Sequence, residues 1–344
     1  MFKKSILVLL FISLKFNVLY SQSINDTLNR IDKNTGKKIG YWIKKFPDGK
    51  IKYQGRFEND KPEGEFKYYY EDGKIKAISN FYNKGTRSFT KTFYPNGKLM
   101  SIGYYLNEKK DSLWKYYNEY DVVIKEEFYK NTLKHGEWKT YYPDGSLTDK
   151  MTFKNGIREG AWEQNYVGGS LKTQFKNDKL EGTYTVYFPS GKLKFQGKYK
   201  NNKKDGIWFW YDSNSLPIKR FTYKDDILKS KEFVYYENKK PVNIRFDSIA
   251  YIYVKSAIVY LKKMDGNQLQ LTEKFSLITD VLGDDNFILI NKNFFANMLS
   301  VKSISPFDEK YFKVEIYPKP EFDIISEEES SKALKAMFND FKFK

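Results

Sequence analysis

Residues 136–159 read GEWKTYYPDGSLTDKMTFKNGIRE, and the chain repeats this pattern. A fixed repeat period decides the architecture, so we place it before any assignment of secondary structure. The period is 24 residues, and only the sixth repeat is shorter, with 22. The eight repeats, and a degenerate ninth, begin at Gly40, Gly64, Ser88, Ser112, Gly136, Gly160, Gly182, Gly206 and Ser230.

Aromatic residues occupy fixed positions within the repeats. The third position is tryptophan in five of the eight, at Trp42, Trp114, Trp138, Trp162 and Trp208. An aromatic residue lies at or near the eighteenth position in all eight: Phe57, Phe81, Tyr105, Tyr129, Phe153, Phe175, Tyr199 and Tyr223. Such columns indicate a structural unit copied along the chain.

Each repeat contains two short aromatic or β-branched runs joined by a turn sequence. In the fifth repeat that turn is Pro143-Asp144-Gly145, and Asn155-Gly156 then returns the chain to the next repeat. Proline presets φ, aspartate accepts a hydrogen bond from its own backbone, and glycine takes a positive φ. No run between turns reaches ten residues, which argues against helix. Each repeat is therefore predicted to be one β-hairpin.

Isolated hairpins are marginal in water, so these hairpins must pair edge to edge. The predicted fold is mainly β: an elongated, single-layer antiparallel meander of about 16 to 18 strands, some 80 Å long at ~4.8 Å per strand. Equal positions of successive repeats should then stack, Trp over Trp and Tyr over Tyr.

The repeats resemble the MORN repeat family. The residues that carry the likeness are Glu63-Gly64, His135-Gly136-Glu137-Trp138, Tyr141-Tyr142-Pro143-Asp144-Gly145, Lys154-Asn155-Gly156, Glu159-Gly160 and Glu181-Gly182. The closer likeness is to the variant repeats of bacterial proteins labelled antitoxin-like, and it covers roughly residues 36–240. The resemblance implies a hairpin array without catalysis of its own, which contacts proteins or membrane surfaces.

The N-terminus has the layout of a secretory signal peptide. Lys3 and Lys4 precede an apolar run from Ser5 to Leu14, which is too short to span a bilayer. We expect residues 1–22 to be a cleaved signal, 23–39 a lead-in, 40–241 the repeat array and 242–344 a small α+β domain. An ordinary buried N-terminal strand is the alternative. The expected location is outside the cytoplasm: periplasmic, outer-membrane-associated or secreted.

The repeat register ends after Pro241. Ile249–Leu261, Asn286–Ile290 and Tyr311–Tyr317 are predicted strands, and Glu273–Leu282 a short helix. A last helix is predicted from a capping box of Ser326 and Glu329 and an apolar stripe. That stripe consists of Leu334, Met337, Phe338 and Phe341. We expect this domain to cap the last strand edge of the array.

Composition excludes several kinds of chemistry. The 344 residues include no cysteine and one histidine, so disulfides, thiolate sites and multi-histidine metal sites are excluded. His135 lies in the loop that closes a repeat and is interpreted as a loop residue, Asp280, Asp284 and Asp285 as a solvated turn, and Glu327–Glu329 as a helix N-terminus. We therefore expect no catalytic, cofactor-binding or metal site.

The net charge of +17 is concentrated in the array. Residues 40–229 carry 36 basic and 24 acidic residues, whereas residues 230–344 carry 17 of each. Lysines recur after the turns and form the candidate interaction surface: Lys50, Lys52, Lys74, Lys76, Lys98, Lys172, Lys192 and Lys194. Only six of the 60 basic residues are arginine, the preferred group for phosphate and base contacts, which argues against nucleic acid. The lysines either solubilise the sheet or attract an anionic envelope component or protein.

These observations favour an exported, non-enzymatic repeat scaffold that binds a protein or an envelope component such as a lipid head group or glycan. One alternative is an antitoxin-like or immunity-like protein that neutralises a partner by binding. The other is an exported hydrolase housed in residues 242–344, which requires paired carboxylates in a cleft.

Overall fold

A computed structural model describes residues 28–283 and 286–341, and the chain divides into two compact units, Met1–Gly160 and Ala161–Lys344. The expected signal peptide at residues 1–22 and the start of the lead-in lie outside the described residues. Within the described ranges, no helix has both the length and the apolar character that a membrane crossing requires.

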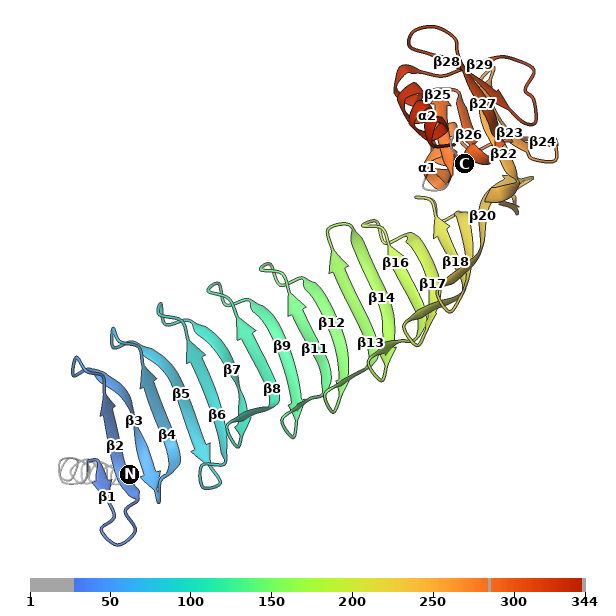
Figure 1. Ribbon diagram of the computed structural model, residues 1–344. Coiled ribbons are helices and arrows are strands. Elements are labelled where there is room, and N and C mark those ends of the chain that lie inside the picture. The colour runs from blue at the N-terminus through green and yellow to red at the C-terminus, as the bar shows by residue number, and fades with distance from the viewer. Residues whose placement is uncertain (1–27, 284–285, 342–344) are drawn as a thin grey trace, which may run out of the picture. The chain divides into compact units, whose positions relative to one another are not determined.

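The first unit is a single layer of antiparallel strands (Figure 1). Its strands are β1 (Arg30–Ile31), β2 (Lys38–Lys45), β3 (Ile51–Glu58), β4 (Lys61–Tyr69), β5 (Ile75–Tyr82), β6 (Arg87–Phe93), β7 (Leu99–Leu106), β8 (Lys109–Tyr117), β9 (Val123–Lys130), β10 (Leu133–Lys134), β11 (Gly136–Tyr141) and β12 (Leu147–Lys154). Each strand from β1 to β8 pairs with the next, and β9 pairs with both β10 and β11. Strand β13 (Ile157–Tyr166) contains the division between the units.

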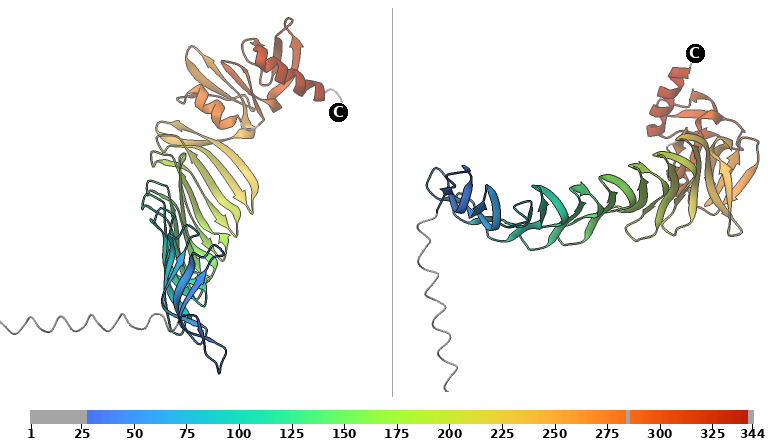
Figure 2. Two further views of the ribbon diagram at one scale, coloured as in Figure 1. Left: turned by 90° about the vertical axis from the view of Figure 1, so that its left-hand side faces the viewer. Right: turned by 90° about the horizontal axis from the view of Figure 1, so that it is seen from below.

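The second unit begins with the same kind of meander. Its strands are β14 (Gly169–Lys176), β15 (Lys179–Leu180), β16 (Gly182–Tyr187), β17 (Leu193–Lys200), β18 (Lys203–Tyr211), β19 (Pro217–Lys224), β20 (Ile227–Glu237) and β21 (Lys240–Arg245). They pair antiparallel and in order from β16 onward. The predicted mainly β fold, an antiparallel meander of hairpins, is confirmed (Figures 1 and 2).

The two turns of each repeat form as their residues predict. In the first repeat the backbone N–H of Lys50 donates to Asp48 Oδ1 at 3.0 Å, and Gly49 has a φ of +88°. The second turn is a tight one in which Asn59 and Asp60 both have positive φ, the conformation that two-residue hairpin turns require. Turn chemistry therefore fixes the hairpin length.

The predicted stacking of equal positions is wrong in detail. In the first unit, third-position rings alternate with eighteenth-position rings. Trp42 contacts Phe57 at 6.0 Å between ring centroids, Phe57 contacts Phe66 at 5.1 Å, and Phe66 contacts Phe81 at 5.2 Å. The third position lies on the first strand of a hairpin and the eighteenth on the second, so a ring of the other kind lies between successive third-position rings. In the second unit two third-position rings also meet directly, Tyr184 and Trp208 at 5.9 Å.

The most deeply buried rings of this ladder lie over glycine. A β-carbon on Gly103 would lie 2.2 Å from the Trp114 ring, closer than any side chain could be accommodated. Gly103 occupies the sixteenth position of its repeat, and Gly55 and Gly197 have the same relation to the next third-position ring. All three covered rings, those of Phe66, Trp114 and Trp208, are 2% exposed. In a single layer, the sheet backbone thus serves as the second wall of the core.

The C-terminal part of the second unit contains two further sheets and two helices. The five-stranded sheet has the order β24 (Gln268–Leu271), β23 (Ile258–Lys263), β22 (Ile249–Lys255), β26 (Phe294–Asn297), β25 (Phe287–Asn291). The three-stranded sheet consists of β27 (Val301–Pro306), β28 (Phe312–Ile316) and β29 (Ile324–Ile325). The helices are α1 (Phe275–Leu282) and α2 (Glu328–Phe341), with 3-10 turns at Phe246–Ser248 and Met298–Ser300.

Two sequence predictions need correction here. Ile249–Leu261 is not one strand but the hairpin β22–β23, which turns where Ser256 and Ala257 adopt positive φ. Ser326 does not cap α2 through Glu329: its hydroxyl accepts from the backbone N–H of Phe312 at 2.9 Å and pairs with the Ser331 hydroxyl at 2.6 Å.

The apolar stripe of the last helix is described only in part. Leu334 is fully buried, as expected of a core position. The side chains of Met337, Phe338 and Phe341 lie outside the described part of the chain.

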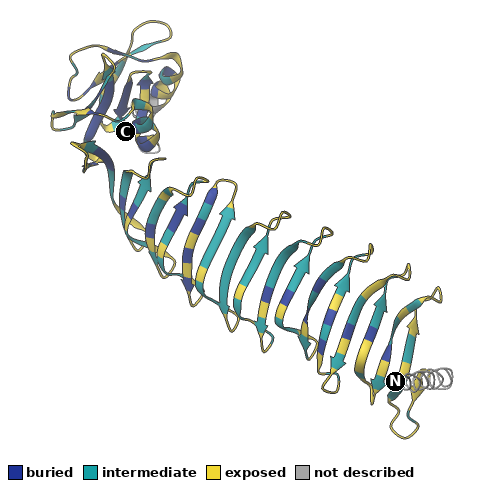
Figure 3. Ribbon diagram, turned by 180° about the vertical axis from the view of Figure 1, so that it is seen from behind, coloured by how far each residue is buried: buried dark blue, intermediate teal, exposed yellow. Residues whose placement is uncertain are grey.

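The five-stranded sheet and α1 pack against side chains of the last strands of the meander. Phe221, Phe233 and Tyr235 share one buried cluster with Ile249 and with Ile278 of α1. Burial is continuous in this region, whereas the meander buries only short segments of each strand (Figure 3). The expected domain boundary between residues 241 and 242 falls within β21, which pairs with β20, and it stays a prediction.

Candidate interaction surface

The side chains of the meander lie on two faces because successive residues of a strand point to opposite sides. The third, sixteenth and eighteenth positions share one face, which we call the ladder face. In the first unit the ladder face carries Trp42, Phe57, Phe66, Phe81, Tyr105, Trp114, Tyr129, Trp138 and Phe153. It is the more aromatic face of that unit.

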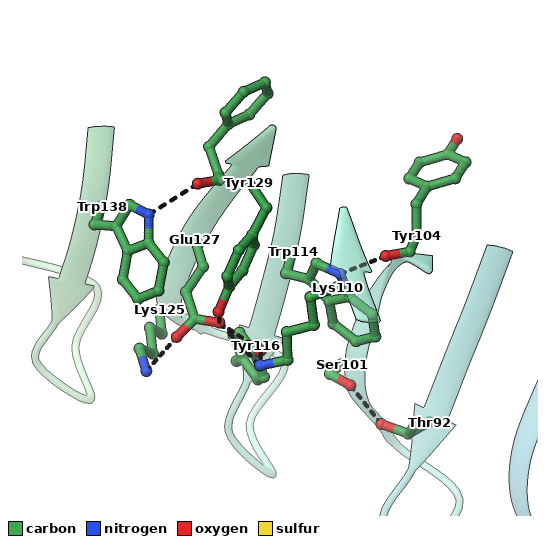
Figure 4. Close-up of polar contacts among 11 residues, drawn as sticks. Thr92, Ser101, Tyr104, Lys110, Trp114, Tyr116, Lys125, Glu127, Tyr129 and Trp138 are labelled. Atoms are coloured by element: carbon green, nitrogen blue, oxygen red, sulfur yellow. Dashed lines mark hydrogen bonds and ion pairs between the residues drawn. The ribbon is translucent and has the colours of Figure 1, made fainter. Parts of the chain in front are cut away.

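A buried carboxylate interrupts the aromatic character of the ladder face. Glu127, at a sixteenth position, is 3% exposed and accepts hydrogen bonds from two lysines and two tyrosines (Figure 4). Lys125 Nζ lies 2.5 Å from its Oε1, and Lys110 Nζ lies 3.0 Å from its Oε2. The hydroxyls of Tyr116 and Tyr129 donate to Oε2 at 2.8 and 3.1 Å. Both carboxylate oxygens are therefore partnered.

The hydrogen-bond partners of Glu127 lower its pKa by more than burial raises it. Burial by itself raises the pKa of a carboxyl group, but hydrogen bonds from Lys125, Tyr116 and Lys110 hold the pKa of Glu127 at about 2. The pKa of Tyr116 is raised, first by burial and then by its hydrogen bond to the Glu127 carboxylate. The group is thus a fixed anion with neutral phenols around it. A general acid or base works best with a pKa near the ambient pH, so this geometry suits structure and not proton transfer.

The opposite face of the first unit carries ion pairs, some between strands and some within one strand. Lys115 Nζ lies 2.9 Å from Glu126 Oε1, and the hydroxyl of Tyr141 donates to Glu126 Oε2 at 3.0 Å. Lys139 Nζ lies 2.8 Å from Glu137 Oε2. These pairs neutralise much of the charge of that face, so its residual positive potential is smaller than the lysine count suggests.

The predicted lysine surface separates into two arrangements. Lys50, Lys74 and Lys98 occupy equal places in successive turns, and each Nζ lies 3.1–3.2 Å from a carboxylate, those of Asp48, Asp72 and Asp121 respectively. A hydrogen bond from the following backbone N–H and the lysine charge lower the pKa of Asp48 and of Asp72. These turn lysines are exposed but locally compensated.

The second arrangement places a lysine over an aromatic ring. The Nζ atoms of Lys52, Lys76 and Lys194 lie 5.6, 5.6 and 5.7 Å from the ring centroids of the residues six positions earlier, Phe46, Tyr70 and Phe188. Such cation–π contacts leave the ammonium group facing water.

The remaining two predicted lysines lie in the second unit. Lys172 Nζ lies 3.5 Å from Glu163 Oε1, and the Lys192 carbonyl accepts from the Phe188 backbone. Five of the eight predicted lysines therefore lie in the first unit and three in the second.

His135 has the role that its place in the repeat predicts. Its Nδ1 accepts from the backbone N–H of Asn155 at 3.4 Å, as the Glu181 carboxylate accepts from Asn201 at 2.8 Å two repeats later. Both residues precede the first glycine of a repeat.

The other polar candidates lie in the C-terminal part of the second unit. The Glu327 carboxylate accepts from the backbone N–H of Lys292 at 3.0 Å, which extends its role beyond the helix N-terminus. Asp284 and Asp285 lie outside the described residues, and among the residues described no three His, Asp or Glu side chains come together as a metal site would require.

Comparison with known families identifies the repeats. The family model of the MORN repeat variant matches residues 62–83, 90–107, 134–155 and 180–201. The chain contains MORN repeats. None of the curated proteins compared with it matches. Among solved structures, the LytTr DNA-binding domain of a putative methyl-accepting/DNA response regulator from Bacillus cereus is 14% identical, with a TM-score of 0.27, over 32% of this chain and 97% of that one. That likeness carries no argument about this protein.

The Glu127 cluster was missed in the sequence although a signal existed. Five repeats have a small residue at the sixteenth position or, in the shortened sixth repeat, at the equivalent place: Gly55, Ser79, Gly103, Thr173 and Gly197. Met151 and Phe221 hold two of the other places, and Glu127 is the one acidic member. An acidic residue in a column of small and apolar residues predicts a buried charge, and a buried charge requires partners.

Proposed function

We propose that this protein is an exported, non-enzymatic scaffold whose MORN repeats bind a protein or an anionic component of the cell envelope. The observation that carries the proposal is the repetition of the same side chains at the same places: turn lysines, lysine-over-ring pairs and the aromatic ladder. A surface of this kind offers many equivalent contacts to an extended partner, whereas catalysis needs one unique constellation.

Electrostatics support binding over chemistry. Glu127 is a buried carboxylate of the repeats and Glu126 a half-buried one. Both have lowered pKa values because lysine and tyrosine side chains hydrogen-bond to them. Groups held in one protonation state contribute rigidity and specificity of contact rather than proton transfer.

Export is part of the proposal and rests on the N-terminal sequence. Its basic start and short apolar run have the pattern of a signal peptide. The lysine-rich, arginine-poor array suits an anionic surface at the envelope.

The proposal is tested by affinity capture from envelope extracts with the full chain as bait. One variant changes Lys52, Lys76 and Lys194 to glutamate, and a control changes the same number of lysines at Lys255, Lys302 and Lys310 of the C-terminal part. We expect a partner that the wild type and the control retain and that the repeat variant loses. Equal capture by all three baits would contradict a role for the repeats.

A further inference from the structure

The aromatic ladder of the first unit has one missing ring. The third repeat carries Thr90 at the third position, where other repeats carry an aromatic side chain. The ring contacts run as far as Phe66 and Phe81, at 5.2 Å, and resume at Tyr105 and Trp114, at 4.8 Å. The ladder face is hollowed here, in a cavity of about 640 Å³ whose lining runs from Tyr53 and Phe57 past Thr90 to Tyr105.

The hollow persists because the backbone fixes the strand spacing. Strands β5 and β6 pair without a register shift, so Ser79 lies directly opposite Thr90. Small residues at both positions leave space that neighbouring strands cannot close without breaking their ladder of hydrogen bonds.

The floor of the hollow carries hydroxyl groups that pair with one another or with a neighbour. The hydroxyls of Ser79 and Thr90 lie 2.8 Å apart. Thr92, which also lines the hollow, pairs with the hydroxyl of Ser101 at 2.6 Å (Figure 4). The side chains of Ser79, Thr90 and Ser101 are buried. Each pair engages one of its two hydroxyl hydrogens, so pairing reduces the capacity of the floor to bind further polar groups.

The walls of the hollow are aromatic. Phe66, Tyr68, Phe81 and Tyr105 line it, and three charged, exposed residues, Asp60, Arg87 and Glu108, belong to its lining as well. Burial has raised the pKa of Tyr68 to about 12 and that of Tyr105 above its ordinary value, so both phenols are neutral. Aromatic walls over a floor of paired hydroxyls favour a planar ring with an apolar body, and the exposed charges can meet a polar group at its edge.

The neighbouring repeats show which group fits between two eighteenth-position rings. Phe66 lies between Phe57 and Phe81, at 5.1 and 5.2 Å. Trp138 lies between Tyr129 and Phe153, at 5.1 and 5.4 Å. Phe81 and Tyr105 form the corresponding pair around Thr90, without the ring between them.

We propose that this hollow binds one aromatic side chain, tryptophan or tyrosine, of a protein partner. The inference deepens the proposed scaffold function and rests on it. The inserted ring covers Thr90 and makes edge contacts to Phe81 and Tyr105, which completes the ladder. It has the same place between two eighteenth-position rings as Trp138 has between Tyr129 and Phe153. A sugar ring fits this site less well, because each of its hydroxyls needs hydrogen-bond partners, whereas the walls are mostly aromatic and the floor hydroxyls already pair with one another or with a neighbour.

The test uses full-length protein and four probes followed by ligand-observed NMR: N-acetyl-tryptophan amide, N-acetyl-tyrosine amide, N-acetyl-leucine amide and N-acetylglucosamine. We expect the two aromatic amides to bind with a Kd on the order of 1 mM and the other two at least tenfold more weakly. Stronger binding of N-acetylglucosamine, or equal binding of the leucine amide, overturns the proposal.

Variants locate the binding on the ladder face. Thr90→Trp places the missing ring in the hollow and should weaken both aromatic amides at least tenfold while raising the Tm by about 2–4 °C. Lys91→Trp adds the same ring on the opposite face of the same strand and should change neither. If Thr90→Trp fails to fold, Thr90→Tyr is used in its place. The chain already contains a tyrosine at a third position, Tyr184, in a repeat that follows Thr173 rather than a glycine. Unchanged binding in the Thr90 variants contradicts the site.

The probe experiment and the capture experiment fail separately. Absence of aromatic amide binding removes the hollow as a site but leaves any repeat-dependent partner in place. Absence of a repeat-dependent partner removes the scaffold function even where the amides bind.

Discussion

Gly103 lies directly beneath the indole ring of Trp114, so close that the position has no room for a β-carbon. Trp114 is 2% exposed, and its Nε1 donates to the Tyr104 carbonyl at 2.8 Å. In a sheet of one layer, a ring can be fully buried only by pressing it against the backbone. The sixteenth-position glycines and the third-position rings that cover them therefore form one packing unit.

Gly103→Ala should destabilise strands β7 and β8 by about 1–3 kcal/mol, the range typical of overpacking. Amide hydrogen exchange in these strands measures the local free energy of opening. Trp114→Ala removes the ring, and in that background Gly103→Ala should cost little more, since nothing is left to collide with the methyl group. Full additivity of the two changes would show that the ring contact is not the cause.

Glu127→Gln should destabilise the first unit because it leaves Lys110 and Lys125 beside a neutral amide. The folded pKa of Glu127 is about 2 and the ordinary value is 4.5. A depressed carboxyl pKa contributes stability above the ordinary value, and that contribution is lost as the pH falls from about 4.5 to about 2. At pH 7 the expected loss is on the order of 3 kcal/mol.

The pH dependence separates this effect from general damage. The difference in urea midpoint between wild type and Glu127→Gln should shrink steadily between pH 4.5 and pH 2. Glu58→Gln, an exposed change in the same unit, is the matched control and should show no such trend. A difference that stays constant over this range argues against an ionic role for Glu127.

Tyr94→Phe removes a hydrogen bond that joins consecutive repeats. The Tyr94 hydroxyl donates to the Tyr117 carbonyl at 2.7 Å, and Tyr70 makes the same bond to Phe93 at 2.7 Å. Loss of one bond should cost about 1 kcal/mol, read from hydrogen exchange at the turn that follows β8. Tyr120→Phe is the control because Tyr120 is 82% exposed, and comparable effects of the two changes would contradict the assignment.

Much of the meander could be predicted from the sequence, and the errors of that prediction have physical causes. The turn residues around Gly49 and the alternation along β2 and β3 are local signals, so hairpin length and fold class followed from them. The partners of Glu127 depend on which strands are neighbours and on the register of their pairing. The same is true of the place of the Phe66 ring between Phe57 and Phe81. Sequence spacing within a repeat does not contain that information. Rings at equal positions were therefore expected to stack on each other, whereas in the first unit third-position rings alternate with eighteenth-position rings.

The candidate lysines illustrate the same limit. Their places after the turns were evident from sequence, but the carboxylate beside Lys98 comes from Asp121 of the next repeat. Compensation of charge between repeats is a property of the paired sheet, so a lysine count overestimates the free positive charge.

Export predicts a shortened chain. Protein isolated from its native host should begin at Gln22 or Ser23, because we expect cleavage after Ser21 or Gln22. Mass spectrometry of the intact N-terminus checks this. Leu9→Arg interrupts the apolar run and should leave full-length protein inside the cell, whereas a full-length wild type outside the cytoplasm would contradict the signal assignment.

The central claim is that the repeats work by contact, and photo-crosslinking in living cells tests it most directly. A photoreactive residue is placed at Thr90 on the ladder face, at Lys52 and Lys76 beside their rings, and at Lys302 in the C-terminal part. The account predicts one and the same partner from the positions in the repeats and a weak or absent product from Lys302. Crosslinks from Lys302 alone, with none from the repeats, would contradict it.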